Sequence, residues 1–169
     1  MTDFDILTAL SKVNNVAIVV QKEDFLRPDL NQSGDWKSRL RSCYKKLSNN
    51  AQRYEMKGLL GKLSVCSDPT IDPIRCVGNH NSTKQPAFPR MHNKFVVFCD
   101  NNAESSPKEV WTGSFNLTQN ASMSLENALL ISDSKIATSY YNEFCQIFAL
   151  SEPLDWDSEW CAPEFRIGT

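Results

Sequence analysis

One stretch, residues 91–131, constrains this chain more than any other part of its sequence. It opens with His92 and Lys94, which stand two residues apart at the start of an apolar run. Alternate side chains of a strand share a face, so a strand over 92–99 is expected to present both residues together. The run 95–99 is almost continuously apolar, which is typical of a strand buried on both sides. An imidazole beside an ammonium indicates chemistry on an anion.

Further polar residues stand at the ends of two later apolar runs. Gly113, Ser114 and Asn116 follow the short run 109–112, and Glu126 opens the next run. Hydrolysis of a phosphodiester needs a nucleophile, an acid for the leaving group, and charge or donors around the phosphoryl oxygens. Glycine permits a tight turn close to a substrate, while a hydroxyl and an amide supply neutral donors. The pattern therefore predicts a substrate-binding turn at 113–116.

Each side chain has an expected role in such a reaction. His92 is expected to act as nucleophile or acid, because an imidazole exchanges protons near neutral pH. Lys94 is expected to supply charge and hydrogen bonds to the phosphate, with Ser114 and Asn116 as further donors. Glu126 is expected to accept from the ring N–H of His92, which would fix the tautomer and raise its basicity.

Taken in order, these motifs resemble those of the phospholipase D superfamily, and more narrowly its short single-motif members, the bacterial endonucleases and the mitochondrial-type enzymes. The matching residues are His92-x-Lys94, Asp100, Gly113-Ser114-x-Asn116 and Glu126-Asn127. The resemblance implies a nucleophilic histidine that forms a phosphohistidine, a second histidine that protonates the leaving oxygen, and hydrolysis by water without a metal. The family usually places its Asp seven residues after the His, a position held here by Cys99. That Asp is mostly structural in the family, so the role of Asp100 stays open.

The number of histidines makes a prediction about assembly. The chain has two, His80 and His92, and only one His-x-Lys pair. A chain with one motif must borrow the second, so we expect a homodimer in which both His92 side chains face one phosphate. The alternative second acid is His80, which lies in the polar loop 78–90 without a lysine partner.

The charge distribution is uneven although the net charge is only −2. Basic residues dominate 35–62, whereas acidic residues dominate from 126 onward. A basic segment can guide a phosphate-bearing substrate, or it can be the solvated face of a helix, and the sequence supports both interpretations. Nucleic acid fits such a chain better than lipid, because we find no exposed amphipathic surface for a membrane.

The cysteines and the termini indicate the compartment. The six cysteines form no CxxC pair and are expected to be free thiols. Cys66, Cys76 and His80 have a spacing that fits no standard zinc pattern, so we expect no metal and no cofactor. No apolar run approaches the roughly 18–20 residues that span a bilayer. Acidic residues near the N-terminus argue against a signal peptide, so a cytoplasmic location without membrane insertion is expected.

Periodicity predicts one α/β domain over 1–169, with a mixed sheet flanked by helices as in a phospholipase D-like fold. Helices are expected after N-caps at Thr2, Asp35 and Ser134, the second ending near Leu47. Strands are expected over 16–20, 63–67, 74–77, 92–99, 109–112 and 126–132. The tail with Trp156, Trp160 and Phe165 is expected to pack on the body or on a partner.

These observations predict a metal-independent phosphodiesterase, a nuclease that cuts DNA or RNA. One alternative is a phospholipid hydrolase of the phospholipase D type. The other is a non-catalytic subunit of the same fold that binds or scaffolds. The sequence does not distinguish DNA from RNA.

Overall fold

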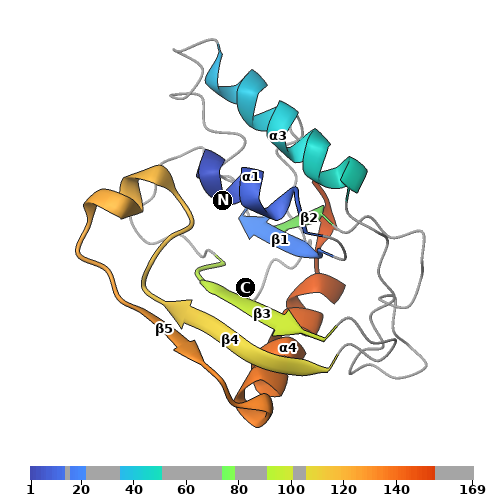
Figure 1. Cartoon of the computed structure of the whole chain (residues 1–169). Helices are drawn as coiled ribbons and strands as arrows, with labels where there is room; N and C mark the ends of the chain where they lie inside the picture. Colours follow the sequence, from blue (N-terminus) through green and yellow to red (C-terminus); the bar gives the residue numbers. More distant parts are fainter. Residues whose placement is uncertain (14–15, 22–34, 51–73, 79–90, 101–105, 155–169) are drawn as a thin grey trace, which may run out of the picture. The chain divides into compact units, whose positions relative to one another are not determined.

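A computed structural model describes residues 1–13, 16–21, 35–50, 74–78, 91–100 and 106–154. Within these ranges the chain forms two three-stranded sheets and three α-helices (Figure 1). The predicted α/β class with a mixed sheet is confirmed. The strand at 63–67, most of the loop at 78–90 and the aromatic tail lie outside the described residues. The chain divides into two compact units, and the prediction of a single domain stays a prediction.

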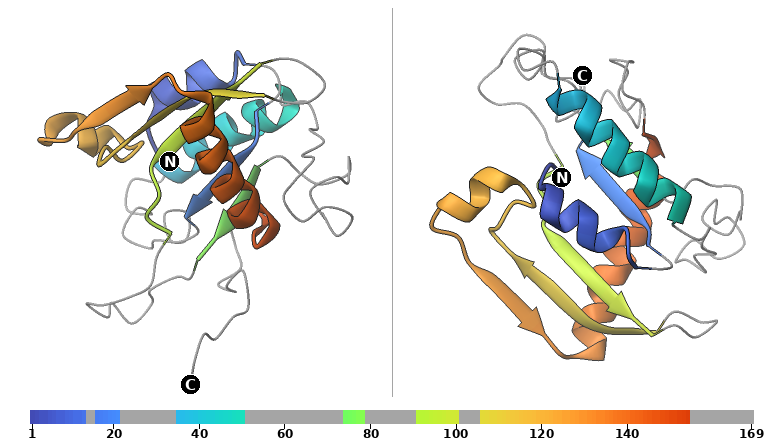
Figure 2. Two further views of the ribbon diagram at one scale, coloured as in Figure 1. Left: turned by 90° about the horizontal axis from the view of Figure 1, so that it is seen from below. Right: turned by 45° about the horizontal axis from the view of Figure 1, so that its top comes forward.

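The first unit contains a small mixed sheet covered by two helices. Strand β1 (Ile18–Gln21) pairs in parallel with β2 (Ile74–Val77), and β2 pairs antiparallel with β6 (Glu152–Pro153). Helices α1 (Phe4–Leu10) and α3 (Trp36–Asn50) pack against each other and over β1 (Figure 2). The strand predicted at 74–77 is confirmed, and β1 begins two residues later than predicted.

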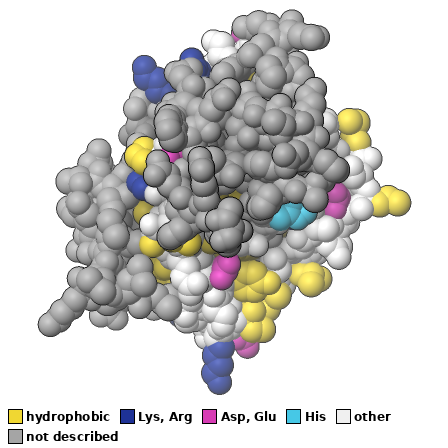
Figure 3. Space-filling view, turned by 180° about the vertical axis from the view of Figure 1, so that it is seen from behind, with side chains coloured by type: hydrophobic (Ala, Val, Ile, Leu, Met, Phe, Trp, Pro, Cys, Tyr) yellow, Lys and Arg dark blue, Asp and Glu magenta, His cyan; other side chains and the backbone are white. Residues whose placement is uncertain are grey.

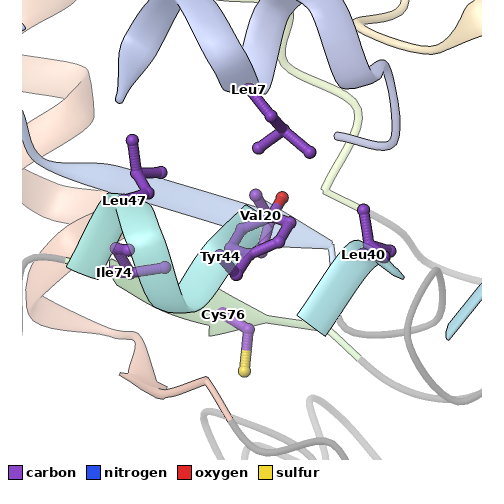
Figure 4. Close-up of a cluster of buried hydrophobic side chains, with 7 residues drawn as sticks. All are labelled: Leu7, Val20, Leu40, Tyr44, Leu47, Ile74 and Cys76. Carbon is purple, nitrogen blue, oxygen red and sulfur yellow. The ribbon is translucent and has the colours of Figure 1, made fainter. Parts of the chain in front are cut away.

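The core of the first unit joins both helices to both parallel strands. Figure 4 shows the seven buried side chains Leu7, Val20, Leu40, Tyr44, Leu47, Ile74 and Cys76. Leu40, Tyr44 and Leu47 form the stripe that helical spacing predicts for α3, and they are 0–3% exposed. The Tyr44 hydroxyl donates to the Met1 carbonyl at 2.8 Å, which satisfies the polar end of this buried ring. Helix α3 also runs past Leu47, where it was predicted to end.

Aspartates cap two helices, where the sequence pattern had favoured their hydroxyl neighbours. The Asp3 carboxylate, and not Thr2, accepts from the N–H groups of Asp5 and Ile6 at the start of α1. At the start of α4 (Ser134–Ala149) the carboxylate of Asp133, and not Ser134, accepts from Lys135 and Ile136. In each cap one carboxylate oxygen accepts from both N–H groups, and the negative charge lies at the positive end of the helix dipole.

The second unit is an antiparallel sheet with a helix against it. Its strands β3 (Phe95–Cys99), β4 (Pro107–Gly113) and β5 (Ala128–Ile131) are hydrogen-bonded in that order. Helix α4 packs against β4 and β3. The Phe95 and Tyr140 rings meet edge to face at 5.2 Å in this contact. A short 3-10 helix, η4 (Gln119–Met123), lies between β4 and β5.

Strand β3 differs from its prediction in two ways. It begins at Phe95, so the prediction that His92 and Lys94 lie on the strand itself is wrong. Phe98 is 48% exposed and no residue of β3 is fully buried, so the prediction of a strand buried on both sides is also wrong. The apolar run marks the strand correctly, but a helix covers only part of it, because β3 is an edge strand of this sheet.

Candidate active site

Strand register gathers most of the predicted site at one end of the second sheet. Phe95, the first residue of β3, pairs with Thr112 of β4, and Gly113 pairs with Ala128 of β5. The residue before β3, the turn after β4 and the residues before β5 therefore lie at the same end of the three strands. These are Lys94, Ser114 to Asn116, and Glu126 to Asn127.

Ser114 is held between Glu126 and Asn127. Its hydroxyl donates a short hydrogen bond to Oε2 of Glu126 and accepts one from the Asn127 N–H at 3.0 Å. Its own N–H donates to Oδ1 of Asn127 at 2.8 Å and to the Asn127 carbonyl at 3.0 Å. The two predicted residues are thus direct partners. Asn127 also belongs to the site because it bonds to Ser114, although the sequence motif assigned it no role.

Gly113 is needed because β4 and β5 approach closely here. A Cβ at this position would collide with the carbonyl oxygen of Asn127 and lie 2.9 Å from the Cα of Ala128. Contacts that short to backbone atoms force the strands apart, since a backbone cannot rotate away as a side-chain end can. Glycine at 113 therefore lets Ser114 reach the Glu126–Asn127 segment.

Lys94 lies in the chain between two residues that contact α4. Its neighbours Asn93 and Phe95 both contact α4, through Glu143 at 3.4 Å and through Tyr140. The carbonyl of Lys94 accepts from the Thr112 hydroxyl at 3.1 Å, which fixes this backbone to the end of β4.

The charge of Lys94 depends on its surroundings. Partial burial lowers the pKa of the Lys94 ammonium below the usual value for lysine, because burial penalises the charged form. The negative charge of Glu126 acts in the opposite direction and raises the pKa of Lys94. The Lys94 ammonium and the Glu126 carboxylate are therefore close enough to interact electrostatically at this end of the sheet.

His92 is the last residue of its segment in the first unit and has an exposed side chain. Histidine is visible at the surface in Figure 3. It stands two residues before Lys94, so their Cα atoms are no more than about 7.6 Å apart. Just before it, the Met91 N–H donates to Oε1 of Gln21 at the end of β1, at 3.0 Å. Sequence reasoning missed Gln21, and its only signal was a polar residue at the end of an apolar run.

Asn116 and Asp100 occupy different places. The Asn116 side chain is exposed on the turn after Gly113, and its carbonyl accepts from Thr118 at 2.7 Å. Asp100 lies beyond the far end of β3, six residues from Lys94, or roughly 20 Å along an extended chain. Its carboxylate pairs with the Lys108 ammonium at 3.2 Å. Lys108 is the extra residue where the β3–β4 register shifts, so this pair closes the hairpin away from the site.

The predicted cysteines and His80 lie only partly within the described residues. Cys43, Cys76, Cys99 and Cys145 are free thiols, whereas Cys66, Cys161 and His80 lie outside the described residues. Among the described residues no three His, Cys, Asp or Glu side chains are placed to hold a metal ion. In the same part of the chain, no helix has the length and apolar character to cross a membrane.

Comparison with known proteins identifies the family of this chain. The family described as "Cardiolipin synthase, PLD-like domain" matches residues 4–148. The chain therefore belongs to the phospholipase D-like family. It is 31% identical over 171 residues to an uncharacterized protein of Acanthamoeba polyphaga mimivirus, and the match covers 94% of this chain. The chain spans 58% of the length of that relative. No solved structure matches the chain.

Proposed function

We propose that this chain is a phosphodiesterase that hydrolyses DNA or RNA through a phosphohistidine on His92. Membership of the phospholipase D-like family supports the general class, a phosphodiester hydrolase. The observation that carries the proposal is the meeting of Lys94, Ser114 and Glu126 at one sheet end, next in the chain to His92. An imidazole can serve as the nucleophile, an ammonium can stabilise charge on the phosphoryl oxygens, and the hydroxyl and carboxylate can position them.

The proposed sequence of events assigns a task to each side chain. The His92 imidazole attacks phosphorus, and a P–N bond forms while the P–O bond to the leaving group breaks. The second imidazole, from the partner's His92, gives its proton to the leaving oxygen and then activates the water that cleaves the P–N bond. Lys94 and Asn116 bind the phosphoryl oxygens, and Ser114 holds Glu126. In this scheme no metal takes part.

A phospholipid substrate is the second candidate, because the matching family is described by the name cardiolipin synthase. Nucleic acid is preferred because the exposed charged side chains of α3 are all basic, as a phosphate backbone requires, while its Leu40, Tyr44 and Leu47 are buried in the core. A non-catalytic subunit that only binds or scaffolds is the third candidate.

One set of assays separates these functions. Labelled single- and double-stranded DNA and RNA are incubated with the chain in EDTA, and liposomes are assayed in parallel for release of phosphatidic acid. The proposal predicts nucleic acid cleavage that survives EDTA and disappears in His92→Asn, whose melting temperature should stay unchanged. Restoration of a chelated enzyme by Mg²⁺ or Zn²⁺ would reject the metal-free mechanism. Phosphatidic acid release alone would favour the lipid substrate, and inactivity on all substrates the scaffold.

A further inference from the structure

The outward face of α3 carries positive charge only. Its four described basic side chains are all exposed: Arg39, Arg41, Lys45 and Lys46. The helix sequence WKSRLRSCYKKLSNN contains no acidic residue. A helix that merely faces water usually mixes both signs, so that opposite charges pair at spacings of three and four. This face therefore differs from an ordinary solvated surface.

Like charges stand close together along α3. Arg41 and Lys45 are four residues apart, where like charges repel. Asp35 directly precedes α3, but the helix itself has no acidic residue in its first turn and no basic residue in its last turn. A polyanion bound to this face would reduce the repulsion between these like charges.

The face is also fixed in its orientation. The Arg39 guanidinium lies 4.7 Å from the centre of the Phe4 ring, a cation–π contact that holds it against α1. On the opposite side Leu40, Tyr44 and Leu47 are locked into the core (Figure 4). The helix therefore cannot turn its apolar side toward lipid and offers only its cations.

We propose that the outward face of α3 binds the phosphate backbone of a nucleic acid through side chains that have no part in the proposed catalysis. From residue 39 to residue 46 the face is about 10 Å long at the rise of an α-helix. One strand of a duplex presents a phosphate every 3.4 Å of axis, so this length meets about three phosphates. Cations on such a face bind any sequence and position the polymer without reading it. The inference goes beyond the proposed function, since it does not require that the bound nucleic acid is cut.

The test measures binding in the His92→Asn full chain, in which cleavage cannot interfere. Fluorescence anisotropy of labelled single- and double-stranded DNA is recorded between about 50 and 200 mM salt. Lys45→Gln with Lys46→Gln should weaken duplex binding by about tenfold and make the slope of log K against log salt shallower by about 1.8, two phosphate contacts at 0.9 each. Lys45→Arg with Lys46→Arg should bind as the parent does.

The matched control removes two exposed lysines elsewhere, Lys108→Gln with Lys135→Gln, and should leave the slope unchanged. Equal slopes for the two glutamine pairs would overturn the inference. If circular dichroism shows that the Lys45→Gln, Lys46→Gln double variant does not fold, the single variant Arg41→Gln makes the same comparison. Its expected change in the slope is half as large. Loss of binding to phosphatidylglycerol vesicles, with DNA binding unaffected, would also overturn it in favour of a membrane surface.

The same data keep this inference apart from the proposed function. A wild-type chain that cuts no nucleic acid, but whose binding depends on Lys45 and Lys46, leaves the inference standing while the nuclease proposal fails. A chain that cuts DNA with a salt slope unaffected by these two lysines supports the nuclease proposal and overturns the inference.

Discussion

The Ser114 hydroxyl donates a hydrogen bond to Oε2 of Glu126, across the start of the β4–β5 connection. Twelve residues separate the two in the chain, and the pairing of Gly113 with Ala128 brings them together. The carboxylate that was expected to orient His92 is thus itself held by a serine that was expected to bind substrate. We infer that Ser114 acts chiefly by positioning Glu126.

Ser114→Ala should therefore lower kcat by removing the donor that holds Glu126, and its effect should not add to that of Glu126→Gln. A double-mutant cycle measures this, with a coupling of roughly 0.5–3 kcal/mol expected for residues in direct contact. Additive losses would show that Ser114 touches substrate independently of Glu126. Ser122→Ala is the control, since the Ser122 hydroxyl bonds only within η4, to Gln119, and its loss should leave kcat unchanged.

Lys94→Ala and Asn116→Ala should each lower kcat by about 10²–10³-fold, the scale for losing one donor to a developing oxyanion. Lys108→Ala is the matched control, because Lys108 is on the same sheet but pairs with Asp100 at its other end. Steady-state kinetics measures kcat and KM separately. A rise in KM with unchanged kcat would mean that these side chains bind substrate and transition state equally.

The pH dependence should report the Lys94 ammonium. Because burial lowers the pKa of Lys94, activity should fall on the alkaline side at a lower pH than an ordinary lysine would give. Glu126 raises the pKa of Lys94, so Glu126→Gln should lower that pKa further and move the alkaline limb to still lower pH. The alkaline limb is measured as kcat/KM against pH, and the pKa of Lys94 is measured directly by NMR of labelled lysine. Glu109→Gln should leave it in place, and an unmoved limb in Glu126→Gln would assign it to another group.

Periodicity and motif order predicted the α/β class, the stripe of α3 and the strand 74–77, because burial repeats along each element. The predicted start of β3 was too early, because His92 and Lys94 continue the alternating pattern that is typical of a strand. The sequence pattern also misplaced two helix caps by one residue, because Asp and Ser or Thr cap almost equally well and stand side by side here. Periodicity and motif order could not predict the contact of Ser114 with Glu126, because the register of a hairpin depends on strand pairing and not on local pattern.

The composite site gives the last prediction. This chain holds one His-x-Lys pair, and the proposed reaction needs two acid–base groups, so we propose two copies about a two-fold axis with His92 of each copy at a shared phosphate. We expect an interface that buries at least the standard ~1,600 Å² and that is obligate for activity. Subunits of wild type and His92→Ala are exchanged at known ratios, and mixed dimers are verified by a tag on one partner.

If both imidazoles are needed, every mixed dimer is inactive and activity falls as the square of the wild-type fraction. Mixing wild type with Lys108→Ala provides the control, since that variant should be fully active and its mixtures should lose nothing. A fall that is linear in the wild-type fraction, or an active monomer on a sizing column, would show that each chain owns a complete site. His80 would then be the first residue to replace in the search for the second acid, because it is the chain's other imidazole.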